Sequence, residues 1–172
     1  EVYGKPVLIY TLEAFEKHKD IDAIEVVCVD GWHEYLKGQA EKYKISKLKW
    51  IISGGKTGQE SIRNGVYNLE GKLNEGDTVI IHDGIRPLVD ESVLTDVIEK
   101  AKKYGAAVTS MPYNEQIFLI DDEFSTTKYI PRETLRRVST PQGYEFKKLL
   151  QNSFDKIRNE CRHDYSKNIV RQ

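Results

Sequence analysis

The sequence has few cysteines, no excess of either charge and no long hydrophobic run, and each shortage excludes a class of protein. Cys28 and Cys161 are its only cysteines. Neither a disulfide framework nor a zinc site is therefore indicated, and a reducing cytoplasm is the expected compartment. The 26 Lys and Arg balance 27 Asp and Glu to a net charge of −1, which argues against a nucleic-acid partner or an anionic membrane. No apolar run approaches the roughly 18 residues of a membrane span.

Methionine is equally scarce, since Met111 is the only one in the sequence. Glu1 is therefore not a translation start, and we expect the 172 residues to be a fragment or a processed chain. A length near the common domain size of about 100–150 residues favours one domain with a sizeable core. The expected organisation is a single domain over residues 1–172.

Short apolar runs alternate with stretches of helical periodicity. Helices are predicted at residues 6–19, 32–43, 60–69, 92–103 and 144–157, and strands at 24–29, 49–53, 78–81 and 106–110. This alternation implies βαβ units, so the predicted fold class is α/β with a doubly wound, mostly parallel sheet. After Met111 the pattern changes to a hairpin, 117–120 with 127–130, and then to an irregular stretch. The hairpin is either a projecting arm over about residues 112–140 or an edge hairpin with no partner.

Three places at the ends of predicted strands carry residues that could bind a ligand, because ligands of open parallel sheets bind beyond the carboxyl ends of the strands. The first is the glycine-rich segment SGGKTGQES at residues 53–61, which opens a helix. Glycines let the backbone approach a ligand closely, and the N–H groups at the start of a helix favour a phosphate or the polar edge of a base. The segment is neither a Walker A loop nor GxGxxG, and a plain connecting turn is the alternative.

The second place is HDGIRP at residues 82–87. Asp83 could ligate Mg²⁺ or accept a hydrogen bond from a sugar hydroxyl, and Gly84 leaves room for a ligand against the backbone. Arg86 is placed to pair with Asp83 and to hold the turn. The alternative is a simple Asp-Gly turn ended by proline. His82 follows an apolar strand and is expected to be packed and hydrogen-bonded rather than a general base.

The third place follows the hairpin and contains Arg132, Arg136, Arg137 and Thr140. Guanidinium groups bind phosphate in a bidentate manner, so this cluster could hold an anionic substrate. A solvated basic face on a short helix is the alternative.

His18 lies among charged residues and is expected at the surface. No Ser-His-Asp, Cys-His or HExxH arrangement can be assembled, so hydrolysis through a covalent nucleophile finds no support.

Taken together, these three places resemble the cytidylyltransferases that make CDP derivatives of methylerythritol or ribitol. The matching phrases are KPVLIYTLEAF (5–15), ISGGKTGQESI (52–62), IHDGIRPLV (81–89) and STPQGYEF (139–146), within a similarity that covers about residues 2–150. The resemblance implies that a sugar-alcohol phosphate attacks the α-phosphorus of CTP and releases pyrophosphate. Because that nucleophile is already ionised, no general base is required, and Lys, Arg and Mg²⁺ supply positioning and charge neutralisation.

The resemblance also implies roles for residues around CTP. Gly55 and Ser61 fall where the family reads the cytosine, and Gly84 falls beside the nucleotide. Asp83 matches the aspartate near the ribose, the metal and the acceptor, so it is the expected Mg²⁺ ligand and one of two expected catalytic residues.

Two further roles concern the acceptor. Arg132 and Thr140 match arm positions that, in the family, reach across a dimer to hold the acceptor phosphate, and Arg132 is the second expected catalytic residue. The projecting hairpin thereby becomes a dimerisation arm, and a homodimer is the implied assembly.

The sequence departs from the family pattern in four places. The family begins with a strand and a GGxGxRM…PKQ phosphate loop that does not precede Glu1, and it closes with an NIKVT strand that KNIVRQ at residues 167–172 echoes only faintly. Gly58 replaces a usual arginine, and Glu115-Gln116 replaces Asp-Thr.

The acceptor is expected to be ribitol phosphate or a related surface-polymer precursor, slightly ahead of methylerythritol phosphate. The alternative is a non-catalytic nucleotide-binding or dimerising relative. A nucleotide-sugar transferase ranks third because no DxD motif follows a central strand.

Overall fold

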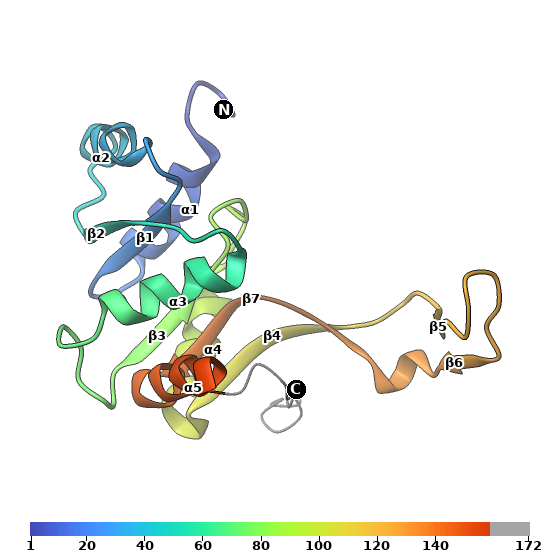
Figure 1. The fold of residues 1–172 in the computed structure, drawn as a ribbon. Helices are drawn as coiled ribbons and strands as arrows, with labels where there is room; N and C mark the ends of the chain where they lie inside the picture. Colours follow the sequence, from blue (N-terminus) through green and yellow to red (C-terminus); the bar gives the residue numbers. More distant parts are fainter. Residues whose placement is uncertain (159–172) are drawn as a thin grey trace.

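The computed structural model describes residues 1–158 and confirms the predicted alternation of strands and helices (Figure 1). The helices are α1 (Val7–Lys17), α2 (His33–Lys42), α3 (Gly58–Asn68), α4 (Glu91–Tyr104) and α5 (Phe146–Arg158), with a 3₁₀ turn η1 (Arg132–Thr134). The strands are β1 (Ile24–Cys28), β2 (Leu48–Ser53), β3 (Thr78–Ile81), β4 (Ala106–Pro112), β5 (Ile117–Leu119), β6 (Lys128–Ile130) and β7 (Arg136–Glu145). Cys161 and residues 167–172 lie outside the described residues.

The strands form a mixed arrangement rather than the mostly parallel sheet that we predicted. Strands β1 and β2 pair in parallel, whereas β7 lies between β3 and β4 and is antiparallel to both. The α/β class is confirmed, and β3 and β4 do run in the same direction on either side of β7. The prediction of the sheet is wrong because residues 136–145, expected to be irregular up to 143 and helical from 144, form the central strand of the second sheet. That segment has few apolar residues, so its composition does not predict a buried strand.

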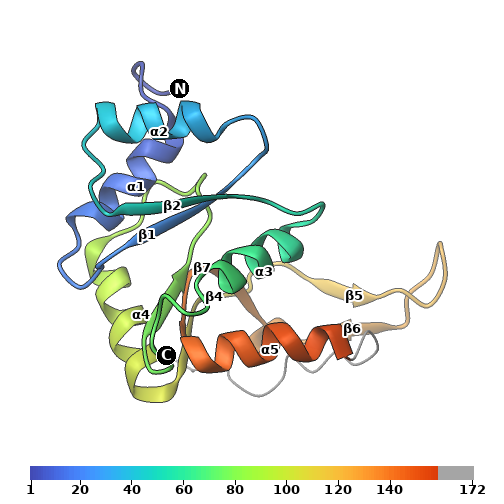
Figure 2. The ribbon, with the colours of Figure 1, turned by 60° about the vertical axis from the view of Figure 1, so that its left-hand side comes forward.

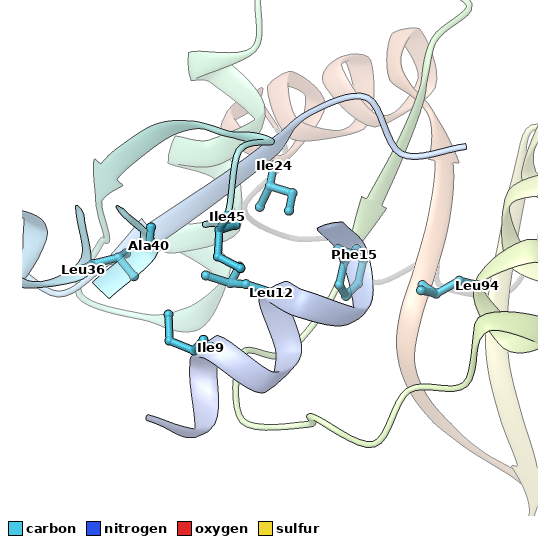
Figure 3. Close-up of a cluster of buried hydrophobic side chains, with 8 residues drawn as sticks. All are labelled: Ile9, Leu12, Phe15, Ile24, Leu36, Ala40, Ile45 and Leu94. Carbon is cyan, nitrogen blue, oxygen red and sulfur yellow. The ribbon is translucent and has the colours of Figure 1, made fainter. Parts of the chain in front are cut away.

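Helices cover the strands from two sides, as a doubly wound fold requires. Figure 2 shows α1 and α4 on one side of the strands and α3 and α5 on the other. The largest core cluster lies beneath α1 and joins it to α2, β1 and α4 (Figure 3). Its buried members are Ile9, Leu12, Phe15, Ile24, Leu36, Ala40, Ile45 and Leu94. Leu12 and Phe15, three residues apart on α1, both belong to this buried cluster and mark the apolar face of the helix.

Helix ends follow from local chemistry. The Asp90 carboxylate accepts a hydrogen bond from the Ser92 amide at the start of α4, and Gly105 ends this helix with a φ of 83°. That left-handed conformation favours glycine. Within the described chain, no helix is long and apolar enough to cross a membrane.

Strands β4 and β7 continue beyond their sheet as a two-stranded ribbon and carry the hairpin β5–β6 away from the rest of the molecule (Figure 1). Met111 lies opposite Arg137 and Pro112 lies opposite Arg136 in this ribbon. The hairpin therefore projects from the molecule as an arm, and it does not lie along the edge of the sheet. Large apolar side chains near its end are exposed, with Phe124 at 91% and Ile120 at 81% of their full accessible area.

Candidate functional site

The turn that follows β3 carries Asp83 and is closed by three hydrogen bonds. The Arg86 amide donates to the Asp83 carbonyl at 3.0 Å, and the Arg86 Nε donates to Asp83 Oδ2 at 2.6 Å. The His82 Nε2 lies 2.9 Å from the Arg86 carbonyl oxygen, so it carries the proton and donates. The predicted pairing of Arg86 with Asp83 is confirmed, and it fixes the orientation of the carboxylate.

Thr140 joins this turn from strand β7. Its Oγ1 lies 3.3 Å from the Asp83 amide nitrogen and 3.3 Å from Asp83 Oδ2. The hydroxyl can accept from the amide and donate to the carboxylate at the same time. The structure thus brings together two residues of the third and second sequence motifs that are 57 positions apart.

Residues of helix α1 contact the turn that carries Asp83. Thr11 is 3% exposed, and its hydroxyl donates to the Gly84 carbonyl at 2.8 Å. A Cβ on Gly84 would lie only 2.8 Å from Leu8 Cδ1, so a larger residue here would displace the end of the Leu8 side chain. Phe15 contacts the His82 ring with a centroid separation of 5.2 Å. Sequence reasoning assigned no role to Thr11, although a hydroxyl on the apolar face of a helix can form a buried hydrogen bond.

The surroundings of His82 act on the pKa of its ring. Burial lowers the pKa of its imidazole below the ordinary value, while the hydrogen bond to Arg86 and the charge of Asp83 act in the opposite direction. The Nδ1 atom is buried and has no hydrogen-bond partner in the described structure. The expectation that His82 is packed and hydrogen-bonded is confirmed.

The glycine-rich loop is held by residues of its own helix. Thr57 caps α3 by accepting from the Glu60 amide at 3.1 Å, and Glu60 Oε2 accepts from the Lys56 amide at 2.7 Å. These two bonds make a variant of the capping box. The Gly55 amide donates to Ser61 Oγ at 3.0 Å. A Cβ on Gly55 would come within 2.3 Å of Glu60 Cβ, so no larger residue fits this conformation.

The two loops open onto one cavity of about 1280 Å³ that is lined by Ser61 and Gly84 among others. Gly55 donates a hydrogen bond to Ser61, and Asp83 directly precedes Gly84, although neither Gly55 nor Asp83 lines the cavity itself. The first and second predicted places therefore meet at one cavity, although β2 and β3, which precede them, belong to different sheets.

Arg132 does not join this cluster within its own chain. It lies in the exposed turn η1 on the arm, beyond the start of β7 at Arg136. Thr140 lies four residues along β7 from Arg136, which corresponds to roughly 13 Å of extended chain before η1 is reached. The structure thus separates the two residues that were predicted to hold one phosphate.

The described residues contain no group of three or more His, Cys, Asp or Glu side chains that could hold a metal ion. Asp83 provides a single carboxylate, and Arg86 and Thr140 both contact its Oδ2. Mg²⁺ commonly binds through one or two carboxylates together with substrate phosphates and water. Asp83 fits this mode of binding but not a site made of protein ligands alone.

Comparisons with known proteins agree with this architecture. Residues 1–167 match the family model described as IspD, 2-C-methyl-D-erythritol 4-phosphate cytidylyltransferase. A relative from Lacticaseibacillus paracasei named ribitol-5-phosphate cytidylyltransferase is 55% identical over 154 residues, which cover 90% of this chain and 65% of the relative. A 2-C-methyl-D-erythritol 4-phosphate cytidylyltransferase from Alkaliphilus metalliredigens is 34% identical over 82% of this chain and 58% of its own length.

A solved structure described as 4-diphosphocytidyl-2C-methyl-D-erythritol synthase from Anaerococcus prevotii superposes with a TM-score of 0.82 at 25% identity, covering 95% of this chain and 70% of that chain. The 172 residues thus span less than two thirds of the Lacticaseibacillus relative, and the match extends over nearly all of the present sequence. On these grounds the chain belongs to the 2-C-methyl-D-erythritol 4-phosphate cytidylyltransferase (IspD) family.

Proposed function

We propose that the full-length protein is a cytoplasmic cytidylyltransferase that transfers CMP from CTP to ribitol 5-phosphate and releases pyrophosphate. The observation that carries this proposal is the contact of Asp83 with both Arg86 and Thr140 beside the cavity lined by Ser61 and Gly84. The name of the 55% identical relative supports ribitol 5-phosphate over 2-C-methyl-D-erythritol 4-phosphate as the acceptor.

The reaction forms one bond and breaks one. An oxygen of the acceptor phosphate attacks the α-phosphorus of CTP, the bond from that phosphorus to the bridging oxygen breaks, and pyrophosphate leaves with the electron pair. The attacking oxygen is ionised at neutral pH, so no side chain has to remove a proton. The packing of His82 and the lowered pKa of its imidazole agree with a mechanism that depends on positioning and charge neutralisation.

The nucleotide is proposed to lie along the two loops of the cavity. Gly55 and Ser61 would read the cytosine through the backbone and the hydroxyl, and Gly84 would lie beside the nucleotide. Asp83 would hold Mg²⁺ together with phosphate oxygens, and the ion would neutralise charge on the triphosphate. The short contact with Arg86 keeps the Asp83 carboxylate oriented toward one position.

The acceptor phosphate is proposed to be held by Thr140 and by Arg132 of a second copy in a homodimer. The arm supports this proposal because it exposes large apolar side chains, including Phe118, Ile120, Phe124 and Tyr129. Contiguous exposed apolar surface on a projecting element favours burial against a partner. The exposed guanidinium of Arg132 lies on that same arm, where a partner's site could receive it.

Residues 1–172 are proposed to form one nucleotidyltransferase domain whose triphosphate-binding cations come from polypeptide outside this stretch. The described loops of the cavity offer Lys56 and Arg86 as their cations, and Arg86 is engaged by Asp83. A triphosphate carries more negative charge than these groups neutralise.

The proposal is tested by measuring pyrophosphate release from CTP by the full-length protein with Mg²⁺ and either polyol phosphate. Turnover with ribitol 5-phosphate is expected, and no turnover with either acceptor would contradict the proposal. Arg132→Ala should raise the KM for the acceptor while the KM for CTP stays the same. Lys128→Ala, a change of an exposed cation in β6 of the same arm, is the matched control and should leave both values unchanged.

A non-catalytic nucleotide-binding relative is the second candidate. It is favoured by Gly58, which stands where the family has an arginine and has no neighbour within 4 Å of the position a Cβ would take. CTP binding by calorimetry without any pyrophosphate release would support this candidate over the enzyme.

A further inference from the structure

Strand β7 changes its register against β4 next to the candidate site. Val108 pairs with Gln142 and Ser110 pairs with Val138, so one residue of β4 lies opposite three residues of β7. We call these three residues the β7 bulge, and they are Ser139, Thr140 and Pro141. Bulges of this kind often re-aim a side chain beside an active site. The β7 bulge contains the hydroxyl that contacts Asp83.

On its other edge, β7 pairs with β3 as far as the β7 bulge. The last pair of this ladder joins Ile81 to Gln142, so two further steps in the same register bring Asp83 opposite Thr140. There the Asp83 amide donates to the side chain of Thr140 at 3.3 Å. The path of the backbone through the bulge therefore determines where the Thr140 hydroxyl lies relative to Asp83.

Two side chains hydrogen-bond the backbone at the two ends of the β7 bulge. Gln142 Nε2 donates to the Ser139 carbonyl at 3.0 Å, and Thr109 Oγ1 donates to the Pro141 carbonyl at 2.8 Å. Both bonds are partly buried, and the Pro141 side chain is less than 2% exposed. The backbone on both sides of Thr140 is thus held by side chains of β4 and β7.

Gln142 is itself oriented by Tyr144. Because the Ser139 carbonyl can only accept, the part of Gln142 that faces it must be the amide nitrogen. The other end of the amide, Oε1, accepts from the Tyr144 hydroxyl at 2.7 Å. Loss of the Gln142 amide would therefore break two hydrogen bonds and release the Ser139 end of the bulge.

We propose that Gln142 and Thr109 are positioning residues for the transfer reaction, because they hold the bulge that directs the Thr140 hydroxyl toward Asp83. This inference rests on the proposed function, in which Thr140 holds the acceptor phosphate. A displaced Thr140 should therefore weaken binding of the acceptor and leave binding of CTP intact. A side chain that only stabilises the fold would not distinguish between the two substrates.

Gln142→Met tests this role with a side chain of similar length that lacks the amide. In the full-length protein, the KM for ribitol 5-phosphate should rise about tenfold, as for loss of one hydrogen bond to a charged group, while the KM for CTP changes less than about twofold. Gln151→Met, the same change at an exposed position of α5, is the matched control and should alter neither value. An unchanged KM for the acceptor, or equal rises for both substrates, would overturn the proposal.

A double-mutant cycle with Thr140 separates positioning from general stabilisation. If Gln142 acts through Thr140, adding Gln142→Met to Thr140→Ala should raise the KM for the acceptor by less than about twofold further, because no hydroxyl is left to position. A further rise of about tenfold in that background would show that the two residues act independently, and it would overturn the proposal.

Hydrogen exchange tests the geometry without requiring any activity. In Gln142→Met, the Asp83 amide should exchange about tenfold faster, because its partner Thr140 is no longer held in place. The Gly54 amide, which donates to the Cys28 carbonyl in the other sheet, should not change. Unchanged exchange at Asp83 would overturn this inference, whereas a wild-type protein without turnover would count against the proposed function alone.

Thr109 provides an independent pair of variants. Thr109→Val removes the donor to the Pro141 carbonyl with little change of volume, and Thr109→Ser keeps it. Valine should raise the KM for the acceptor and quicken exchange at the Asp83 amide, each about tenfold, and serine should restore both values. Equal behaviour of the two variants would overturn the role assigned to Thr109.

Discussion

The two loops of the candidate site are stabilised in different ways. The glycine-rich loop depends on neighbours in sequence, since Thr57 and Glu60 cap the helix that it opens. The turn that carries Asp83 depends on distant elements, since Thr11 holds it from α1 and Thr140 holds it from β7. One loop should therefore respond to changes in its own helix, and the other to changes far away in the sequence.

The largest effect is expected from Phe15→Ala. Phe15 is 8% exposed and packs against His82, so its truncation removes the hydrophobic support of the Asp83 turn and leaves a cavity. The free energy of unfolding, measured by urea denaturation, should fall by about 3–5 kcal/mol. Gln59→Ala, at an exposed position in the glycine-rich loop, is the control and should change it by less than about 0.5 kcal/mol. Equal effects of the two changes would contradict the comparison.

Thr11→Val tests the long-range hydrogen bond without a large change of shape. The substitution removes the donor from the partly buried bond to the Gly84 carbonyl, which should cost about 1–3 kcal/mol in the same measurement. Thr11→Ser keeps the donor and should restore most of the difference. If valine is tolerated as well as serine, the hydrogen bond from α1 does not stabilise the turn.

Thr57→Ala tests the local support of the other loop. Loss of the N-cap should reduce the free energy of unfolding by about 1 kcal/mol, and Thr57→Ser should be nearly neutral. Hydrogen exchange should quicken at the start of α3 and stay unchanged in residues 82–87. Faster exchange in both loops would show that they are coupled rather than independently held.

The smallest effect concerns pH. Because burial lowers the pKa of folded His82, the folded state disfavours the protonated ring, whereas the unfolded chain protonates near pH 6.5. The stability that neutral His82 contributes is therefore present above about pH 6.5 and is lost as the pH falls through the lowered folded pKa. Urea midpoints of wild type and His82→Gln, compared between pH 7.5 and pH 5, should diverge on the acid side. Parallel pH profiles would count against this role of His82.

The same contrast explains what could be predicted from the sequence. The glycine-rich loop was located correctly because its glycines and the helix that follows them form a local pattern. The strand β7 was missed because Arg136, Arg137 and their neighbours have the composition of a loop, and pairing on both edges overrides that composition. His18 was predicted at the surface from its charged neighbours, yet it is 1% exposed and hydrogen-bonds Thr95 at 3.0 Å. That prediction is wrong because a contact across 77 residues leaves no trace in the local sequence.

Strand β7 belongs to two parts of the molecule, because Arg136 lies in the arm and Thr140 contacts Asp83. Successive side chains of a strand point to opposite faces, so a shift of one residue in this short interval would turn Thr140 away from Asp83. The arm can therefore vary in length during evolution only beyond the ribbon, in the loop between Leu119 and Lys128. A comparison of insertions and deletions across relatives should find them in that loop and not between Arg136 and Thr140.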